Sequence, residues 1–234
     1  MDTAGLFSLT GKVALITGST RGIGAAIARG FADAGARVWI HGLEAEAGQT
    51  LAEQLNGQFI DGDLSDPNAI KHMVNDLSAR EERLDILVNN AGVQEPMSVE
   101  NLDMAVYDRL LQINLRAPVE LTGLLIPLLS RSPGASVINV TSIHDTTPHP
   151  DDIPYCISKA GLAMFTKAAS IELAKHAIRI NNLAPGAIET AINRDILDRI
   201  GRDKFRERIP LDVAQVEQVV GPALFLASDA SNYL

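Results

Sequence analysis

Residues 13–24 read VALITGSTRGIG, in which a short apolar run, Val13–Ile16, leads directly into a glycine-rich turn, Thr17–Gly24. The apolar run predicts a buried β-strand, and the spaced alanine and isoleucine residues of Gly22–Asp33 predict a helix. Glycines at positions 18, 22 and 24 allow a tight turn and close approach of the backbone to a ligand. A strand, a glycine turn and a helix N-terminus together are typical of a pyrophosphate site, although G-x-x-x-G-x-G differs from the common G-x-G-x-x-G.

The same alternation of strand and helix continues along the chain. Further short apolar runs predict strands at Arg37–His41, Gln58–Ile60, Ile86–Val88, Ser136–Val140 and Ile178–Leu183. Spaced apolar residues predict helices at Glu44–Leu55, Pro67–Leu77, Leu102–Leu129, Tyr155–Lys175 and Val216–Ala227. This repetition predicts an α/β fold, a parallel sheet covered by helices on both faces. We find no linker, composition shift or internal repeat, so we expect residues 1–234 to form a single doubly wound, Rossmann-type domain.

Composition excludes several classes of protein. The chain has 234 residues, 46% hydrophobic and 21% charged, which argues against disorder, a coiled coil or a fibre. Its 29 acidic and 20 basic residues give a net charge of −9, so we expect neither nucleic acid nor an anionic membrane as a partner. A single cysteine, Cys156, excludes an internal disulfide and a multi-thiolate metal site, and we expect no metal. We expect a cytoplasmic protein, because no run reaches ~18 apolar residues and no leader-like segment opens the sequence.

Two irregular stretches interrupt the pattern, each following a predicted strand. Residues 141–154 are rich in proline, histidine and aspartate, and residues 187–210 are charged and weakly periodic. Ligands of open α/β sheets bind beyond the carboxyl ends of the strands. We therefore expect substrate contacts in two loops, at about 142–154 and 187–210.

Tyr155 and Lys159 stand four residues apart in a predicted helix. Residues at i and i+4 share one helix face, so the phenol and the ammonium point the same way. A nearby ammonium favours the phenolate and lowers the pKa of the phenol, which suits general acid–base chemistry. Taken alone, this pair is weak evidence, because such spacing often arises by chance.

In combination, the motifs resemble the short-chain dehydrogenase/reductase family, and within it the branch of 3-oxoacyl-carrier-protein reductases. The resemblance runs from about Leu6 to Leu234, with the motifs in the family's order. They are the Thr17–Gly24 turn, Asp63-Leu64, Asn89-Asn90-Ala91-Gly92, Asn114, Ser142, Tyr155 with Lys159, and Pro185–Thr190. The resemblance implies an NAD(P)-dependent oxidoreductase that transfers a hydride between a nicotinamide cofactor and a carbonyl or secondary alcohol.

The resemblance also implies roles for individual residues. Tyr155 is the general acid or base, Ser142 orients the substrate oxygen, and Asn114 holds a water that links Lys159 to solvent. Lys159 binds the nicotinamide ribose and lowers the pKa of Tyr155. Substrate contacts are expected from Ser142, Tyr155 and the loop residue His144, for which a solvated position is the alternative.

Cofactor contacts are expected from the turn, from the ends of three later strands and from the Tyr155–Lys159 pair. In this family Asp63 binds the adenine edge, the Asn90 motif lines the ribose, and Ile188 with Thr190 holds the carboxamide. The full set is Gly18, Thr20, Arg21, Gly22, Ile23, Gly24, Asp63, Leu64, Asn90, Ala91, Gly92, Tyr155, Lys159, Pro185, Gly186, Ile188 and Thr190.

The end of the second predicted strand bears on which cofactor is used. NAD-specific relatives place an acid there, whereas this chain has Gly42 at the expected position. Arg21 can pair with a 2′-phosphate, so NADP is favoured, with NAD as the alternative. Glu44 is a competing feature, because its carboxylate can take the place of the missing acid.

Substrate and assembly stay open at this stage. The polar 142–154 loop suits a sugar or polyol, whereas the overall resemblance suits an acyl thioester. Alternative functions are a nucleotide-sensing protein without turnover, or a relative of sugar-nucleotide epimerases and dehydratases. The resemblance implies a homodimer or homotetramer, and it implies a seventh, C-terminal strand that the sequence lacks, which leaves six.

Overall fold

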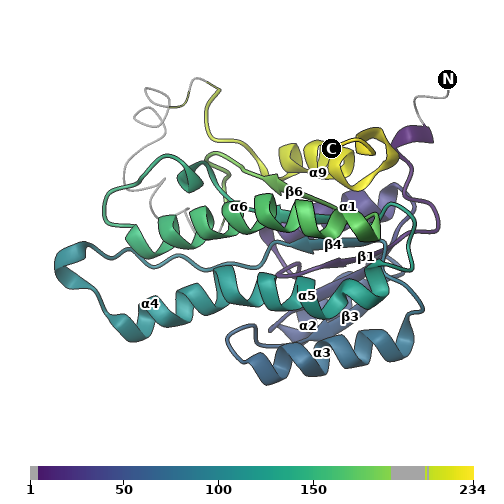
Figure 1. Ribbon diagram of the computed structural model, residues 1–234, viewed down its shortest axis with the longest axis horizontal. Coiled ribbons are helices and arrows are strands. Elements are labelled where there is room, and N and C mark those ends of the chain that lie inside the picture. Colours follow the sequence, from purple (N-terminus) through teal and green to yellow (C-terminus); the bar gives the residue numbers. More distant parts are fainter. Residues whose placement is uncertain (1–4, 191–208, 210) are drawn as a thin grey trace.

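The computed structural model describes residues 5–190, 209 and 211–234. Six parallel strands form one sheet in the order β3-β2-β1-β4-β5-β6 (Figure 1). Their bounds are β1 Val13–Ile16, β2 Arg37–Gly42, β3 Gln58–Asp61, β4 Ile86–Asn89, β5 Ser136–Val140 and β6 Arg179–Leu183. Each predicted strand is present within one residue at either end, and the predicted α/β class is confirmed.

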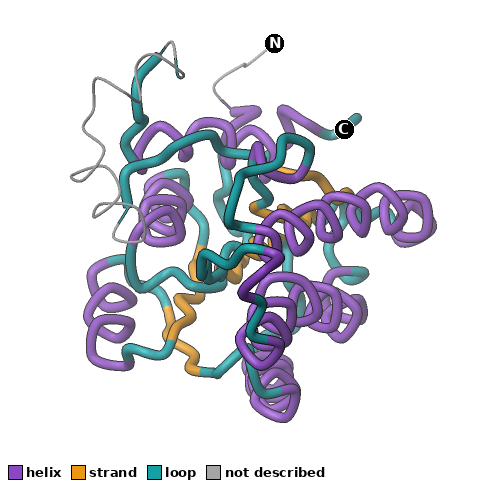
Figure 2. Tube along the Cα trace, turned by 90° about the vertical axis from the view of Figure 1, so that its left-hand side faces the viewer, coloured by secondary structure: helices purple, strands orange, loops and turns teal. Residues whose placement is uncertain are grey.

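Helices cover both faces of the sheet, as Figure 2 shows with helices on either side of the strands. α1 (Gly22–Asp33), α2 (Ala45–Gln54) and α9 (Val220–Ala227) pack on one face, and α3 (Pro67–Arg80), α5 (Ala117–Leu129) and α6 (Ile153–Leu173) pack on the other. α4 (Met104–Leu111) precedes α5. Short 3₁₀ turns occupy Gly5–Phe7, Val99–Asn101, Ile143–Asp145, Ala174–His176, Val216–Val219 and Asp229–Ser231.

Two hydrophobic clusters, one on each face, form the core. In β1, Val13 and Leu15 point into the cluster of α3, α5 and α6, whereas Ala14 and Ile16 point into that of α1, α2 and α9. Alternation of side chains along a strand explains why all four residues are buried. β1 is therefore apolar throughout, as expected for a central strand of a parallel sheet covered on both faces.

The order in which successive strands are added to the sheet reverses between β1 and β4, because β2 and β3 lie on one side of β1 and β4 to β6 lie on the other. In such sheets the crevice beyond the carboxyl ends of the two central strands is the usual ligand site. The sequence motifs at the ends of β1 and β4 are brought together there.

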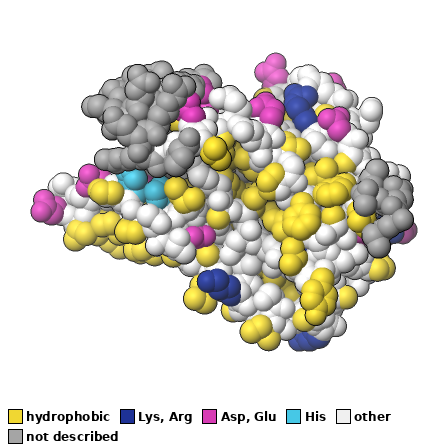
Figure 3. Space-filling model, turned by 90° about the horizontal axis from the view of Figure 1, so that it is seen from above, with side chains coloured by type: hydrophobic (Ala, Val, Ile, Leu, Met, Phe, Trp, Pro, Cys, Tyr) yellow, Lys and Arg dark blue, Asp and Glu magenta, His cyan; other side chains and the backbone are white. Residues whose placement is uncertain are grey.

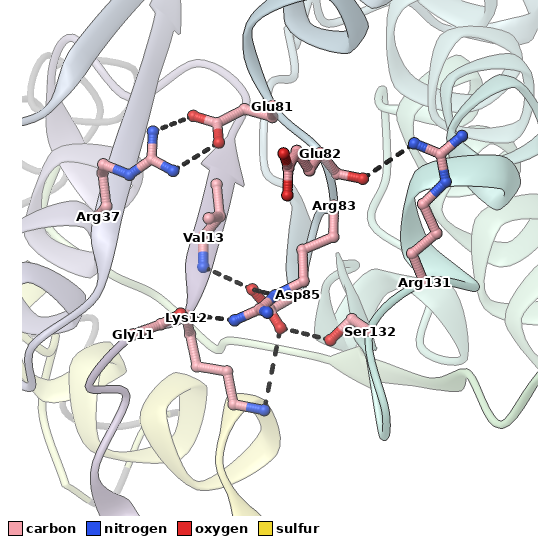
Figure 4. Close-up of polar contacts among 10 residues, drawn as sticks. All are labelled: Gly11, Lys12, Val13, Arg37, Glu81, Glu82, Arg83, Asp85, Arg131 and Ser132. Carbon is pink, nitrogen blue, oxygen red and sulfur yellow. Dashed lines mark hydrogen bonds and ion pairs between the residues drawn. The ribbon is translucent and has the colours of Figure 1, made fainter.

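A network of charged groups ties the opposite, amino-terminal ends of the strands together (Figure 4). Asp85, 2% exposed just before β4, accepts hydrogen bonds from the Val13 N–H (2.8 Å), from Arg83 (3.2 Å) and from Ser132. Glu81 is also buried, where it pairs with both guanidinium nitrogens of Arg37. This network lies at the far end of the strands from the ligand motifs, so its role is in stability.

The predicted helix at Leu102–Leu129 is helical without a break from Met104 to Leu129, but it is not an α-helix throughout. Residues Gln112–Arg116 form a π-helical turn between α4 and α5, with Asn114 at its centre and fully buried. Turns of this kind are rare and occur frequently at functional sites. Among the described residues, no helix is long and apolar enough to cross a membrane.

Candidate active site

The glycine turn after β1 is closely packed. Gly18 and Gly22 have φ values of +61° and +59°, which favour glycine. A Cβ on Gly18 would lie 2.8 Å from the Cα of Ala91, and one on Gly24 would lie 2.4 Å from the Gly18 carbonyl oxygen. Glycine is therefore required here by contact as well as by conformation.

Asn90 holds this turn against the end of β4. Its Nδ2 donates to the carbonyl oxygens of Thr17 (2.8 Å) and Gly18 (3.0 Å). In return, the Thr17 hydroxyl oxygen accepts the N–H groups of Asn90 and Ala91, each at 3.0 Å. The motif at the end of β4 thus acts as a support for the turn.

The N-terminus of α1 faces the same turn. Its N-cap residue, Arg21, makes no side-chain hydrogen bond to the first N–H groups of the helix. Uncapped N–H groups and the positive end of the helix dipole suit an anionic ligand such as a pyrophosphate. This feature, together with the close backbone approach at Gly18, fits the predicted dinucleotide.

His41, which the motif analysis did not select, joins the turn to two strands. Its Nδ1 accepts the Gly18 N–H at 3.1 Å, and its Nε2 lies 3.0 Å from the carbonyl oxygen of Gly62. A backbone N–H can only donate and a carbonyl can only accept, so the ring is neutral with its proton on Nε2. Burial lowers the pKa of His41 to about 4, against the opposing effects of the Gly62 hydrogen bond and the Asp61 charge.

We expect His41 to make the fold sensitive to acid. Its folded-state pKa of about 4 lies below the ordinary 6.5, so its contribution is complete above pH 6.5 and is lost as pH falls toward 4. The loss should be about 3 kcal/mol of unfolding free energy. Urea unfolding between pH 7 and pH 4 should show a flatter profile for His41→Asn than for the wild type. Exposed His72 supplies the control: the His72→Asn profile should follow the wild type, and parallel profiles for all three proteins would contradict the prediction.

Ser142 and Tyr155 meet at the carboxyl end of β5. The Ser142 hydroxyl oxygen accepts the His144 N–H at 3.1 Å, and the hydroxyl lies close enough to the Tyr155 phenol to lower its pKa. Tyr155 lies in the first turn of α6, which Pro154 helps to start. The predicted catalytic hydroxyl and phenol are therefore in direct contact.

The pKa of Tyr155 differs from the sequence prediction. Burial raises it; the Ser142 hydrogen bond opposes the rise, and the charges of Asp152 and Cys156 add to it. The net pKa of Tyr155 is therefore raised, not lowered as the sequence predicted from Lys159, because desolvation of the phenolate dominates. Nζ of Lys159 lies 5.6 Å from the centre of the Tyr155 ring and donates to the Val140 carbonyl oxygen instead (2.8 Å).

Lys159 is 4% exposed, and burial lowers its pKa to about 8 while the charge of Asp145 opposes the shift. The ammonium is thus still charged at neutral pH. A Cβ on Gly92 would lie 3.6 Å from Nζ of Lys159 and 3.4 Å from Oδ1 of Asn114. Gly92 therefore lies between Lys159 and Asn114. Its neighbour Ala91 contacts the glycine turn at Gly18.

Asn114 links the π-helical turn to two other elements. Its amide accepts the Val93 N–H and donates to the Val93 carbonyl oxygen, both at 2.8 Å, and Nδ2 also lies 3.2 Å from the Ser158 hydroxyl. The widened turn lets this side chain reach the loop after β4 and the middle of α6 together. Asn114 thus fixes the distance between the cofactor motif and the helix of Tyr155.

The remaining predicted cofactor residues are placed around the same strand ends. Asp63 accepts the Ser65 N–H at 2.8 Å after β3, whereas the N-cap of α3 is Asp66. Buried Leu64 follows Asp63, and Ile23 packs on the core behind the turn. Thr20 bonds to Glu44 at 3.0 Å.

The loop after β6 reaches both parts of the site. The Pro185 carbonyl oxygen accepts the Ile143 N–H at 3.2 Å, and a Cβ on Gly22 would lie 4.0 Å from Cγ2 of Thr190. Gly186 and the buried Ile188 lie between these two contacts. Most of the predicted substrate loop 187–210 lies outside the described residues, which include only 187–190 and 209 of it.

Two further polar residues, Gln94 and Asp152, lie near the start of α6; Gln94 was not selected from the sequence, and Asp152 was included only as part of the 142–154 loop. Asp152 is 1% exposed and is hydrogen-bonded to Gln94. Neither residue belongs to a recognised motif. The position of Asp152, three residues before Tyr155, is the only sequence feature that could have pointed to this pair. Within the part of the chain that the structure describes, no three His, Cys, Asp or Glu side chains gather as a metal site.

Comparison with known proteins agrees with this fold. The family model described as short chain dehydrogenase matches residues 12–200. The chain is a short-chain dehydrogenase. As a member of this family it is an NAD(P)-dependent oxidoreductase, as the glycine turn and the Ser142–Tyr155–Lys159 group predict.

Similar short-chain dehydrogenases act on different substrates. The 3-oxoacyl-[acyl-carrier-protein] reductase FabG of Chlamydia trachomatis is 32% identical over 233 residues, which cover 97% of this chain and 94% of the relative. D-threitol dehydrogenase of Mycolicibacterium smegmatis is 32% identical over 231 residues, which cover 96% of this chain and 89% of the relative. Among solved structures, a gluconate 5-dehydrogenase from Burkholderia cenocepacia in complex with NADP and tartrate is 32% identical to this chain. The two structures superimpose with a TM-score of 0.94, and the match covers 99% of this chain and 93% of the other.

Proposed function

We propose that this enzyme interconverts a ketone and a secondary alcohol with NADP(H), using Tyr155 as the general acid and base. The observation that carries the proposal is the contact between Ser142 and Tyr155, with buried Lys159 on the same helix face. Contacts through Ala91 and Gly92 connect this group to the glycine turn. A binding protein without turnover would not require all of these groups.

NADPH, when bound, supplies the hydride, and the chain supplies position and the proton. Ser142 and Tyr155 are placed to share hydrogen bonds to the substrate carbonyl oxygen, and the raised pKa of Tyr155 keeps its proton available for donation. The Lys159 ammonium, charged below pH 8, favours the phenolate that forms when this proton leaves. In the reverse direction the same phenolate accepts the alcohol proton.

The test is NADPH oxidation followed at 340 nm with a panel of carbonyl compounds, which includes a ketoester, a hydroxyketone and an acyl thioester. Turnover of at least one of them supports the proposal. Failure of every carbonyl, with both NADPH and NADH, would overturn it. We propose that the enzyme works in the cytoplasm. A chain with a single cysteine forms no internal disulfide, which fits a reducing compartment.

The end of β2 supports NADP over NAD. β2 ends at Gly42, where a Cβ would lie 2.5 Å from Cγ2 of Thr20, so an acidic side chain does not fit without moving Thr20. Arg21 is exposed beside it and pairs with Glu44 at 3.1 Å. Glu44 therefore does compete for Arg21, and a 2′-phosphate has to displace its carboxylate.

Replacing Arg21 by alanine should weaken NADPH binding roughly fivefold to tenfold, because an exposed charge pair contributes about 1 kcal/mol. NADH binding should change little, since NADH lacks the 2′-phosphate. Fluorescence titration of both cofactors measures the two Kd values. The matched variant Glu44→Gln should tighten NADPH binding by freeing Arg21. Equal affinity of the wild type for NADPH and NADH would refute the preference.

We also propose that the enzyme is a homodimer or homotetramer. Ile157, Met164 and Ile171 of α6 are 45%, 61% and 80% exposed and recur every seven residues, so they share one face of the helix. Val119 and Leu124 of α5 are exposed too. Exposed hydrophobic side chains (yellow) are also visible from above in Figure 3. A second copy of the chain is the partner that would cover the face formed by α5 and α6.

A further inference from the structure

The pair Gln94 and Asp152 lies next to the catalytic tyrosine and has no part in the steps above. Asp152 is the N-cap residue of α6, three positions before Tyr155. Nε2 of Gln94 donates a hydrogen bond to Oδ2 of Asp152. A β-bridge between Met97 and Asp152 holds the loop after β4 alongside the start of α6, so the pair joins the cofactor loop to the helix of Tyr155.

The carboxylate fixes the orientation of the Gln94 amide. An ionised carboxylate only accepts hydrogen bonds, so the NH₂ group of Gln94 faces Asp152 and its carbonyl oxygen, Oε1, faces away. Among the described residues no group donates to Oε1, and Gln94 is partly exposed. Gln94 therefore presents an acceptor of fixed direction on the loop after β4, which runs alongside the start of the Tyr155 helix.

Burying the Asp152 carboxylate lowers the stability of the fold, and the orientation of Gln94 gives a reason for it. The residue is 1% exposed, and its second oxygen, Oδ1, is buried without a hydrogen-bond partner in the described part of the chain. Burial raises the pKa of Asp152, while the Gln94 hydrogen bond and, when protonated, His149 and His144 oppose this rise. Such a group destabilises the fold, and an unsatisfied buried polar atom needs a reason.

Two histidines extend the polar surface next to this pair. The rings of His144 and His149 are 5.2 Å apart, and their Nδ1 atoms bond to the carbonyl oxygens of Thr147 (2.9 Å) and Pro150 (2.8 Å). Each Nδ1 therefore carries the proton, which leaves Nε2 as an acceptor in the neutral ring. Histidine side chains (cyan) are visible on the surface in Figure 3. The surroundings of Tyr155 are thus rich in acceptors, which suit a substrate that carries hydroxyl donors.

We propose that Gln94, positioned by Asp152, accepts a hydrogen bond from a hydroxyl group of the substrate and so selects polyols and hydroxyketones over unsubstituted ketones and acyl chains. This inference rests on the proposed function, since it concerns the substrate of the same site. It decides between the polyol and the acyl thioester that the sequence left open. Gln94 is a specificity-determining residue, and Asp152 is a positioning residue.

The test compares two ketones with the same four-carbon chain, erythrulose and butan-2-one, with NADPH as reductant. The wild type should reduce erythrulose with a higher kcat/KM. Gln94→Leu should lower kcat/KM for erythrulose roughly fivefold to tenfold, mainly through KM, because one hydrogen bond to bound substrate is removed. Its kcat/KM for butan-2-one should stay within about twofold, since that ketone has no hydroxyl to donate.

Two more variants separate positioning from a structural role. In Asp152→Asn the new side chain has both a donor and an acceptor, so the Gln94 amide is no longer held one way round, and erythrulose should again be the affected substrate. A merely structural role would lower kcat/KM for both ketones together. Gln49→Leu, at an exposed position on α2, is the control and should change neither.

The outcomes are distinguishable from failure of the proposed function. A wild type that reduces butan-2-one or an acyl thioester better than erythrulose overturns this inference and leaves the proposed function standing. The same holds for a Gln94→Leu enzyme that loses both ketones equally. If no carbonyl compound is reduced, the proposed function itself fails.

Discussion

Replacing Tyr155 by phenylalanine is expected to lower kcat for carbonyl reduction by roughly 10²–10⁴-fold, the usual contribution of a positioned general acid. Phenylalanine keeps the ring, which is packed near Lys159, and removes only the hydroxyl that contacts Ser142. Among the described residues of the Ser142–Tyr155–Lys159 group, the phenol is the proposed proton donor, because the aliphatic Ser142 hydroxyl is a far weaker acid. Steady-state rates with the best carbonyl of the panel measure the change.

The matched control is Tyr233→Phe, which removes the same atom from a fully exposed side chain. That variant should keep the wild-type kcat. The Kd of NADPH, measured by fluorescence, should rise far less than kcat falls in Tyr155→Phe, since one lost hydroxyl contact costs little beside the loss of the general acid. A Tyr155→Phe enzyme as fast as the wild type would show that the proton comes from elsewhere.

The strands were predictable because each contains a short apolar run, and the central strand β1 is buried at every position, without a polar interruption. The run Val13–Ile16 is observed with the predicted bounds, and so is Ser136–Val140. Predicting one helix for Leu102–Leu129 failed in its middle. Apolar spacing does not distinguish an α-helix from one that widens by a single π-turn at Asn114.

The site was less predictable than the fold, because its electrostatics depend on burial. A lysine four residues from a tyrosine predicts a lowered phenol pKa, yet Lys159 points to the Val140 carbonyl oxygen, and desolvation raises the pKa of Tyr155. His41 was counted only as part of a strand. Its contacts to Gly18 and Gly62 depend on three strand ends meeting, which no local pattern contains.

The same limit applies to Asp85, whose sequence context is an ordinary acidic residue before a strand. In the fold its carboxylate is buried among Val13, Arg83 and Ser132, which come from separate segments of the chain (Figure 4). Lys12 adds a more distant charge at 4.0 Å. The two oxygens of one side chain thus anchor the starts of β1 and β4 and the turn before β5.

Asp85→Ala is therefore expected to lower the free energy of unfolding by about 3–5 kcal/mol, the usual loss when one partner of a buried charge cluster is removed. The variant leaves the Val13 N–H and the Ser132 hydroxyl buried without their acceptor, which is the main source of the loss. Urea unfolding at pH 7 measures it, and NADPH binding well below the melting temperature should persist, because the network lies away from the site. The control is Asp76→Ala, which breaks an exposed pair with Arg80 (3.1 Å) and should cost no more than about 0.5 kcal/mol. Similar losses in the two variants would mean that burial of the Asp85 carboxylate contributes nothing beyond a surface ion pair.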